Sequence, residues 1–319
     1  MSNELVDVHA HYLTDAYVQA ATAAGHVRPD GMPTWPTWSV EAHLALMDRH
    51  SISRSLLSLS SPGVHFGDDV AARLLARQVN EYAADVVRQR PDRFGLFAVL
   101  PLPDVDGTLI EIAYAFDELH ADGVAVKTNA HGRYLGDPLF EPVLAELDRR
   151  GAVVFVHPTS PPNWRQVALG RPLPMLEYLF DTTRTVSDLL FSGALQRYPH
   201  LRVVIPHGGA ALPLLGERIE LFRTMFLAAD PEDTGPDTRE LLSRLWYDTA
   251  GTPFPVQIPT LIAVTDVDHV LYGSDYCFTP PRGVDAQIRS IDEAQPPKHG
   301  HTWRSLTTRN AMALLSPTI

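Results

Sequence analysis

Four histidines and one aspartate stand at the ends of short apolar runs, where their side chains could share one site. They are His9, His11, His157, His207 and Asp275. Neutral imidazole nitrogens with one carboxylate oxygen form the donor set that a borderline divalent ion such as zinc selects, with an open position left for water or substrate. The residue types therefore predict a divalent metal site, with Zn²⁺ preferred and Mn²⁺ as the alternative.

The spacing of the first two histidines indicates how they are presented. His9 and His11 lie two residues apart in the run of residues 5–11. Successive side chains of a strand alternate between its two faces, so both imidazoles lie on the same face at the C-terminal end of this strand. Most other histidines fall on expected helices or loops and are interpreted as ordinary core or surface residues.

Eight short β-branched or apolar runs alternate along the chain with longer stretches of helical periodicity. The runs cover residues 5–11, 52–60, 94–101, 123–129, 152–157, 203–207, 245–250 and 270–275. The helical stretches include residues 70–89, 107–120, 138–150, 186–198 and 211–226. An eight-fold alternation of this kind predicts a single domain over residues 1–319, a closed (β/α)8 TIM barrel rather than an open doubly wound sheet.

Three inserts interrupt this alternation after strands. Residues 14–39 and 159–178 are rich in proline and contain tryptophan, and residues 228–239 are acidic. Loops that follow the strands of a barrel cover its C-terminal face, where active sites are built. We expect the inserts 14–39 and 159–178 to form walls or lids over a pocket, whereas residues 228–239 fit a plain surface loop equally well.

Composition excludes several classes of function. The net charge is −12, and only Lys127 and Lys298 are lysines, so no basic stripe exists for a nucleic acid. One cysteine, Cys277, cannot form an internal disulfide. No apolar run is long enough for a membrane helix and no signal-peptide pattern is visible, so a cytoplasmic protein is expected. Dinucleotide, P-loop and serine-hydrolase motifs are absent.

Several motifs together resemble a known family. The segments are Val-Asp-Val-His-Ala-His ending at His11, Val-Phe-Val-His-Pro around His157, Pro-His-Gly-Gly around His207, and Gly-Ser-Asp-Tyr around Asp275. They resemble the amidohydrolase superfamily, in its branch of metal-dependent non-oxidative decarboxylases related to aminocarboxymuconate semialdehyde decarboxylase. Within that branch, residues 134–137, 180–184 and 190–193 are most similar to 6-methylsalicylate decarboxylase-like sequences.

The resemblance implies a role for each matching residue. His9, His11, His157 and Asp275 match the ligands of one catalytic metal ion, and His207 matches a histidine beside the metal that acts as acid or base. The implied reaction is loss of CO2 from a small ortho-hydroxybenzoate-like or unsaturated carboxylic acid. Either Asp275 or His207 delivers the proton, and the sequence does not choose between them. A homodimer or homotetramer is the implied assembly.

Two residues depart from the pattern of this branch. Lys127 ends the fourth run, where binuclear hydrolases of the superfamily carry a carbamylated lysine. Lys127 therefore keeps open an alternative function, hydrolysis of a lactone, amide or ester by two metal ions. It could instead bind a substrate carboxylate or pair with an acid. Cys277 replaces a proline and is interpreted as a buried structural thiol rather than a metal contact.

Three further residues are candidates for binding the substrate. Residues 181–183 look like helix caps, which would place Arg184 in a first turn, where its charge opposes the helix dipole. A substrate carboxylate or an acid at a subunit interface would explain it equally well. Trp164 and Phe278 lie on loops at the barrel mouth and are candidates for stacking on an aromatic ring, with loop packing as the plain alternative.

Overall fold

A barrel of eight parallel strands forms the centre of the molecule. The computed structural model describes residues 4–227, 236–296 and 301–316. The strands follow one another around the barrel in sequence order: β1 (Leu5–His11), β2 (Ile52–Ser58), β3 (Phe94–Val99), β4 (Gly123–Lys127), β7 (Val153–His157), β8 (Arg202–Ile205), β9 (Trp246–Asp248) and β10 (Val270–Leu271). Bridges from Asp7 to Tyr272 and from Ala10 to Tyr276 join the first strand to the last segment, so the predicted closed (β/α)8 barrel is confirmed.

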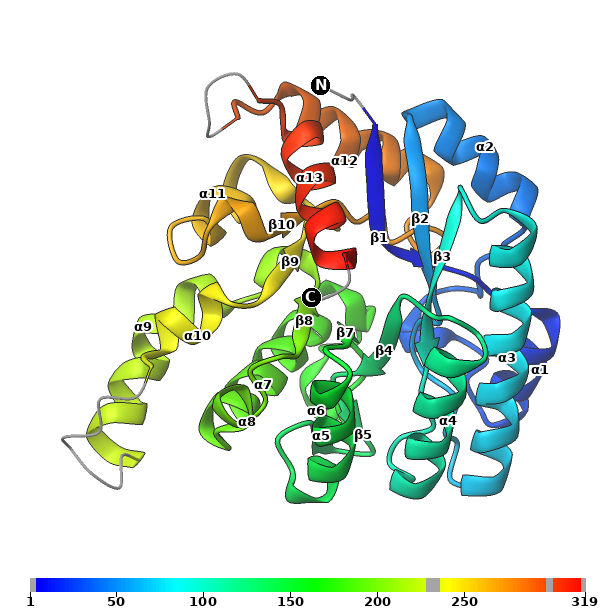
Figure 1. Cartoon of the computed structure of the whole chain (residues 1–319), viewed down its shortest axis with the longest axis horizontal. Helices are drawn as coiled ribbons and strands as arrows, with labels where there is room; N and C mark the ends of the chain where they lie inside the picture. The colour runs from blue at the N-terminus through cyan, green and yellow to red at the C-terminus, as the bar shows by residue number, and fades with distance from the viewer. Residues whose placement is uncertain (1–3, 228–235, 297–300, 317–319) are drawn as a thin grey trace.

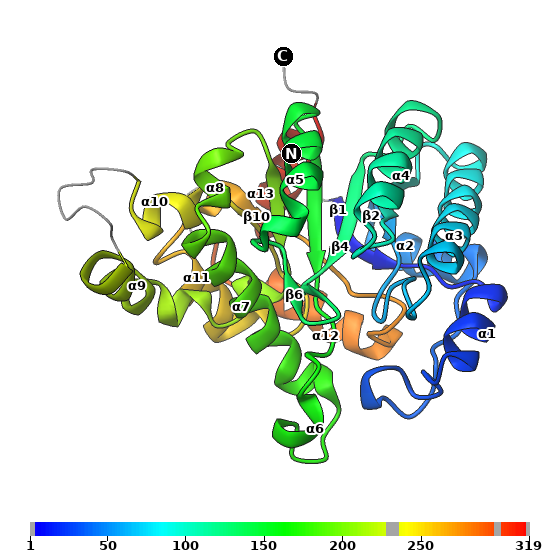
Figure 2. The ribbon, with the colours of Figure 1, turned by 90° about the horizontal axis from the view of Figure 1, so that it is seen from below.

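Helices surround the barrel (Figures 1 and 2). The longer ones are α1 (Asp15–Ala23), α2 (Val40–His50), α3 (Asp69–Gln89), α4 (Val105–Asp117), α5 (Glu141–Arg149), α7 (Glu177–Phe191), α9 (Leu212–Phe222), α12 (Pro281–Glu293) and α13 (Trp303–Leu315). Shorter helices are α6 (Trp164–Val167), α8 (Ala194–Arg197), α10 (Thr238–Ser243) and α11 (Ile258–Leu261), with single turns at η1 (Pro29–Gly31), η2 (Pro138–Phe140), η3 (Leu173–Met175), η4 (His207–Gly209), η5 (Arg223–Leu227), η6 (Pro253–Gln257) and η7 (Val267–His269). No described helix is long and apolar enough to span a bilayer.

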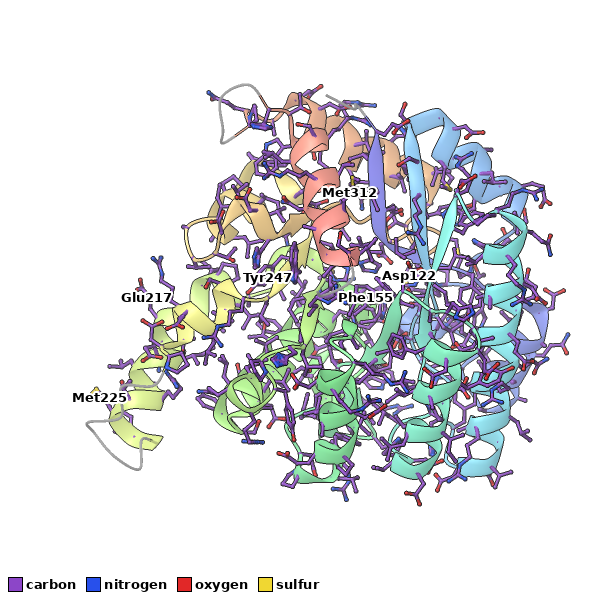
Figure 3. All side chains as sticks on the ribbon, viewed as in Figure 1. Asp122, Phe155, Glu217, Met225, Tyr247 and Met312 are labelled. Atoms are coloured by element: carbon purple, nitrogen blue, oxygen red, sulfur yellow. The ribbon has the colours of Figure 1, made fainter. Side chains whose placement is uncertain are left out.

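The inside of the barrel is filled by apolar side chains. Val8, Phe97, Phe155 and Leu271 are fully buried in one cluster, together with Leu314 of α13. Phe155 lies near the middle of the molecule in Figure 3, whereas Met225 lies far out beyond α9. Because side chains fill the interior, the candidate metal ligands lie at one end of the barrel. Packed interiors of this kind are typical of β/α barrels.

Several strands end earlier in the structure than the sequence predicted, although β1 and β7 end where expected. The expected strand 123–129 stops at Lys127, and a separate hairpin of β5 (Asn129–Ala130) and β6 (Arg133–Tyr134) follows it. His207 and Asp275 lie in turns just after β8 and β10, with backbone φ of 54° and 57°. Both residues therefore adopt the left-handed conformation that non-glycine residues seldom take, which is common at functional sites.

The expected helix over residues 186–198 was wrong at both ends. α7 begins at Glu177 and ends at Phe191, and Gly193, with φ of 71°, separates it from α8. The expected caps at residues 181–183 thus lie inside the helix, and Arg184 is not in its first turn. Tertiary contacts of the buried Asp181 outweigh the local capping preference of these residue types.

The inserts are partly helical. Residues 14–39 contain α1 and η1, and residues 159–178 contain α6, η3 and the start of α7. They meet where the Ser160 hydroxyl donates to the Asp30 carboxylate, and where Gly31 packs beside Pro172. Of the third insert, residues 228–235 lie outside the described residues, and α10 begins at Thr238.

Candidate metal centre

Three histidines and one aspartate converge at the C-terminal end of the barrel. One possible ligand atom from each of His9, His11, His157 and Asp275 lies within 4.8 Å of the others. A register shift between Asp7 and Ala10 against β2 adds one residue to β1, so that His9 and His11 both face the site after the inward Val8. The main-chain N–H of Asp275 donates to the His9 carbonyl oxygen at 2.7 Å, which fixes the last turn on β1.

The Nδ1 atoms of His9 and His11 each contact a polar partner on the side of the ring away from the cluster. Nδ1 of His9 lies 2.8 Å from Oδ2 of the fully buried Asp248. Nδ1 of His11 lies 3.0 Å from Oγ of Ser58, a hydroxyl that itself donates to a main-chain carbonyl oxygen. Both Nδ1 atoms therefore donate, and their Nε2 atoms face each other at 3.1 Å. A cation placed between these two nitrogens would satisfy both lone pairs.

His157 completes the same pattern. Its Nδ1 lies 2.8 Å from the Pro158 carbonyl oxygen, which can only accept, so the Nε2 lone pair is directed away from the backbone. Three Nε2 lone pairs and the Asp275 carboxylate therefore form the site. Ring nitrogens held by partners behind them are typical of metal-ligating histidines. The chemistry of this donor set fits one divalent ion.

The electrostatics of the cluster favour a positive charge. Burial alone lowers the pKa of His9, but Asp248 and Asp275 outweigh burial and raise it to about 10. Burial lowers the pKa of His11 to about 4. Burial raises the pKa of Asp275, but hydrogen bonds from His11, His207 and His9 overcome this and hold it well below its usual range. The two carboxylates thus stabilise a cation at the Nε2 atoms.

His207 lies beside the cluster without joining it. Its Nε2 is 3.9 Å from Oδ2 of Asp275, and its main-chain N–H donates to Oδ1 of Asp248 at 2.9 Å. Its Nδ1 is buried and has no hydrogen-bond partner among the described residues. The side chains of His207 and Asp275 are 14% and 22% exposed, so this side of the cluster is open to a ligand.

Lys127 reaches toward the cluster from β4, where it pairs in register with His157. Its ammonium group donates to the Leu59 carbonyl oxygen at 2.5 Å. Burial lowers the pKa of Lys127 to about 7, although Asp30 acts in the opposite direction. Part of the Lys127 amine is therefore neutral at physiological pH. It then adds less positive charge next to the candidate cation site.

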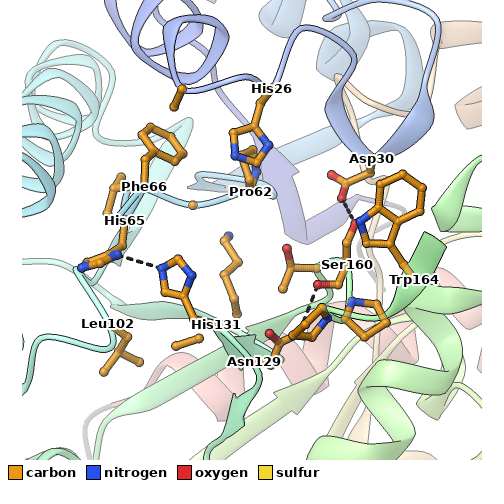
Figure 4. Close-up of a pocket in the computed structure, with 18 of the residues that line it drawn as sticks. His26, Asp30, Pro62, His65, Phe66, Leu102, Asn129, His131, Ser160 and Trp164 are labelled. Atoms are coloured by element: carbon orange, nitrogen blue, oxygen red, sulfur yellow. Dashed lines mark hydrogen bonds between the residues drawn. The ribbon is translucent and has the colours of Figure 1, made fainter. Parts of the chain in front are cut away.

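A cavity of about 950 Å³ lies next to the cluster (Figure 4). Residues of both inserts line it, among them Arg28, Asp30, Ser160 and Trp164. Lys127 also lines it, whereas the four candidate ligands do not. The cavity therefore adjoins the cluster on the Lys127 side.

The other expected substrate contacts are placed differently. Trp164 lines the cavity, with the Arg165 guanidinium 4.5 Å from its ring centre. Phe278 packs edge-on against the His11 ring at 5.6 Å and is not part of the cavity lining. Arg184 is 48% exposed and lies 3.6 Å from Asp181 on its own helix, so it already has an acidic partner.

Asp248 and Asp181 have roles that the sequence analysis missed. Asp248 ends β9, in the expected run 245–250, and an acid at a strand end was the available signal. Asp181 is fully buried and accepts hydrogen bonds from Thr128, Asn129 and Tyr134. As expected for a structural thiol, Cys277 is buried, and burial raises its pKa to about 12.

Comparison with known proteins gives consistent matches. The family model described as "Amidohydrolase" matches residues 6–314. A 6-methylsalicylic acid decarboxylase of Penicillium expansum is 37% identical over 285 residues, 86% of this chain and 85% of that protein. The crystal structure of an amidohydrolase II protein, 34% identical, has a TM-score of 0.90 over 98% of this chain and 99% of the other. A dihydroxybenzoic acid decarboxylase of Polaromonas, solved with bound manganese, shares the fold with a TM-score of 0.82 at 21% identity, over 98% and 97% of the two chains.

Proposed function

This chain belongs to the amidohydrolase family, and from that premise we propose that it is a metal-dependent, non-oxidative carboxy-lyase. Its substrate is a small aromatic acid with a hydroxyl group ortho to the carboxylate, such as 6-methylsalicylate. The observation that carries the proposal is the convergence of three Nε2 lone pairs and the Asp275 carboxylate beside His207. The named activity of the 37% identical Penicillium relative supports the same reaction.

His9, His11, His157 and Asp275 would hold the metal ion. When bound, a divalent ion supplies Lewis acidity toward the carboxylate and the ortho oxygen of the substrate. Zinc is proposed because imidazole nitrogens and one carboxylate suit it. Manganese, present in the Polaromonas relative, is the alternative.

Asp275 and His207 handle the proton of the reaction. Their side chains lie 3.9 Å apart on the open side of the cluster, so either can face the ring carbon that bears the carboxylate. Protonation of that carbon weakens its bond to the carboxylate. The bond then breaks, its electron pair returns to the ring, and CO2 leaves as aromaticity is restored. One proton is consumed and one CO2 released per turnover.

The cavity residues bind the substrate in this proposal. Lys127 contributes a donor for a carboxylate, and Trp164 supplies an aromatic face. Phe278 holds the His11 ring, which limits the space for the substrate. Arg184, which is half exposed beside Asp181, is proposed to bind either a substrate carboxylate or an acid at a subunit interface.

The proposal includes the setting of the enzyme. The chain is a single domain over residues 1–319, with the inserts 14–39 and 159–178 as walls of the substrate pocket. It works in the cytoplasm on a small carboxylic acid, without a nucleic acid or membrane partner, as a homodimer or homotetramer. Exposed apolar side chains such as Leu214 and Met225 on α9 and η5 support self-association. Light scattering coupled to size exclusion measures the assembly directly.

Metal content and CO2 release test the proposed reaction together. Protein purified without added metal is analysed for metal per chain and assayed with a panel of ortho-hydroxybenzoates that includes 6-methylsalicylate. One metal per chain with CO2 release is the expected result. Two metals per chain, a carbamylated Lys127 and no CO2 from any compound would replace the proposal with the hydrolase alternative.

A further inference from the structure

Two serines at the end of β2 are directed toward the candidate metal ligands. Leu56 lies in the apolar cluster inside the barrel, whereas Leu57 and Leu59 pack in the core that the barrel shares with its helices. Because side chains alternate along an extended segment, Ser58 and Ser60 share the inward face with Leu56. This local pattern brings two hydroxyl groups to the C-terminal end of the barrel, beside the histidines.

The two serines contact different nitrogens. Ser58 contacts Nδ1 of His11, on the side of the ring away from the cluster. Ser60 instead contacts a nitrogen that faces the cluster, since its Oγ lies 3.4 Å from Nε2 of His157. Nδ1 of His157 contacts a carbonyl oxygen that can only accept, so Nε2 of the neutral ring is an acceptor and the Ser60 hydroxyl is the donor. A distance of 3.4 Å is long for this hydrogen bond, so the hydroxyl is weakly held.

This contact cannot persist when an ion binds at the cluster. Nε2 of His157 has one lone pair, which either accepts from Ser60 or coordinates the ion. Ser60 is 3% exposed, and among the residues that the structure describes its hydroxyl has no other partner. A buried hydroxyl without an acceptor is unfavourable. Ion binding therefore frees a donor that borders the cluster, and an oxygen of a bound ligand can accept from it.

The surroundings of this donor favour an anionic acceptor. Lys127 pairs in register with His157. Its ammonium group donates to the carbonyl oxygen of Leu59, the residue before Ser60. Lys127 also lines the adjoining cavity, where Asp30 is the only carboxylate among the described lining residues. A hydrogen bond from a hydroxyl group to a carboxylate is about twice as strong as one to a neutral acceptor, so a carboxylate suits this position best.

From this geometry we propose that Ser60 is a substrate-binding residue that donates a hydrogen bond to the substrate carboxylate. In the ion-loaded protein, the Ser60 hydroxyl leaves Nε2 of His157 and turns to a carboxylate oxygen held at the cluster. The inference rests on the proposed function and deepens it, because it names the group that fixes the carboxylate beside the metal ligands. Ser58 stays a positioning residue, since it acts only through His11.

Binding of benzoate tests the proposed donor. Benzoate has a carboxylate but no ortho hydroxyl group, so the proposed reaction does not consume it. Its dissociation constant is measured by calorimetry on zinc-loaded wild type and on zinc-loaded Ser60→Ala. The variant is expected to bind benzoate roughly tenfold to a hundredfold more weakly, which is the effect of one hydrogen bond to a charged group.

Zinc affinity distinguishes Ser60 from a residue that only supports a ligand. Ser60→Ala removes the group that competes for Nε2 of His157, so it is expected to bind zinc at least as tightly as the wild type. Ser58→Ala removes the partner of Nδ1 of His11 and is expected to bind zinc about 10- to 100-fold more weakly. Competition with a chelator of known affinity measures both.

A matched control and a second substitution complete the test. Ser55 is a fully buried serine of the same strand, and its hydroxyl has no partner among the described residues. Ser55→Ala should therefore keep the wild-type affinities for zinc and benzoate. Ser60→Gly removes the same hydroxyl as Ser60→Ala and should reproduce its effects, so a folding defect in one variant does not decide the result.

The outcomes separate this inference from the proposed function. Equal benzoate affinity in the wild type and the Ser60 variants, no benzoate binding by the wild type, or a loss of zinc affinity in Ser60→Ala as large as in Ser58→Ala would overturn the role of Ser60. Benzoate affinity that depends on Ser60, without CO2 release from any ortho-hydroxybenzoate, would support this role and refute the decarboxylase proposal. CO2 release together with benzoate binding that ignores Ser60 would do the reverse.

Discussion

The chemistry of the site depends on which nitrogen of each imidazole is free. His9, His11 and His157 all use Nδ1 on a partner behind the ring, so their Nε2 atoms converge with Asp275. A different partner for any one ring would turn its lone pair away from the cluster. The sequence therefore supplies the candidate ligand residues, and the hydrogen-bond partners of their Nδ1 atoms orient them.

A substitution of His207 tests catalysis separately from metal binding. His207→Asn is expected to keep the metal content of the wild type, because His207 is not among the converging ligands. It should lower kcat by about 10²- to 10⁴-fold, the usual contribution of a general acid or base. Metal analysis and CO2 release on the same preparation measure both. Turnover at the wild-type rate with the metal retained would remove His207 from the mechanism.

Asp248 holds the His9 ring and is not one of the four converging residues. The Asp248→Asn substitution replaces the carboxylate beside Nδ1 of His9 with an amide, which is a weaker hydrogen-bond acceptor. It is expected to lower metal affinity by about 10- to 100-fold. Competition with a chelator of known affinity measures the change. Asp106→Asn, at an exposed position on α4, is the control. Equal affinity in both variants would show that Asp248 has only a structural role.

Lys127 links pH to stability. Because its pKa is lowered on folding to about 7, the unfolded chain binds more protons between about pH 7 and pH 10. The stability of the wild type relative to Lys127→Met should therefore rise with pH across this window and be lost as the pH falls. Urea unfolding of both proteins at several pH values measures the difference. A difference independent of pH would contradict the lowered pKa.

At the scale of elements, one buried carboxylate connects a helix to the cavity wall. Asp181 of α7 receives hydrogen bonds from Thr128 and Asn129 after β4 and from Tyr134 of β6. These contacts hold the β5–β6 hairpin and explain why α7 continues through residues whose types favour a helix start. The sequence around Asp181 suggests a cap, and only the neighbouring elements make it an internal anchor.

Asp181→Asn should weaken this anchor. An amide keeps the shape of the side chain but accepts less strongly and places an N–H against donors, so the free energy of unfolding is expected to fall by about 2 kcal/mol. Urea denaturation measures the loss. Asp85→Asn, an exposed position on α3, should change stability by less than about 0.5 kcal/mol. A similar small change at Asp181 would mean that the anchor is not needed.

At the scale of the whole molecule, closure of the barrel brings the site together. β1, β7 and the turn after β10 are far apart in sequence, yet a parallel barrel aligns their C-terminal ends around one axis. A metal ion bound by His9, His157 and Asp275 would therefore link the first, fifth and last strands. Such a link should stabilise the folded state as a whole.

Metal removal tests this coupling. A ligand that binds only the folded protein stabilises it by about 4 kcal/mol at a thousand times its dissociation constant. Chelation is therefore expected to lower the Tm by several degrees, and Zn²⁺ or Mn²⁺ should restore it. Differential scanning calorimetry with and without chelator measures the shift. The His9→Ala variant, which lacks one ligand, should show little response, and an equal response would place the ion elsewhere.

The sequence by itself determined the strand order, the closed barrel and the residues at the strand ends, because burial imposes a local pattern on each strand. It also carried the family resemblance that the comparisons confirm. The roles of the individual site residues stay predictions. Tertiary structure alone decided that Asp248 supports His9 and that Asp181 lies within α7. Both features depend on contacts between segments distant in the chain, which no local pattern of residues encodes.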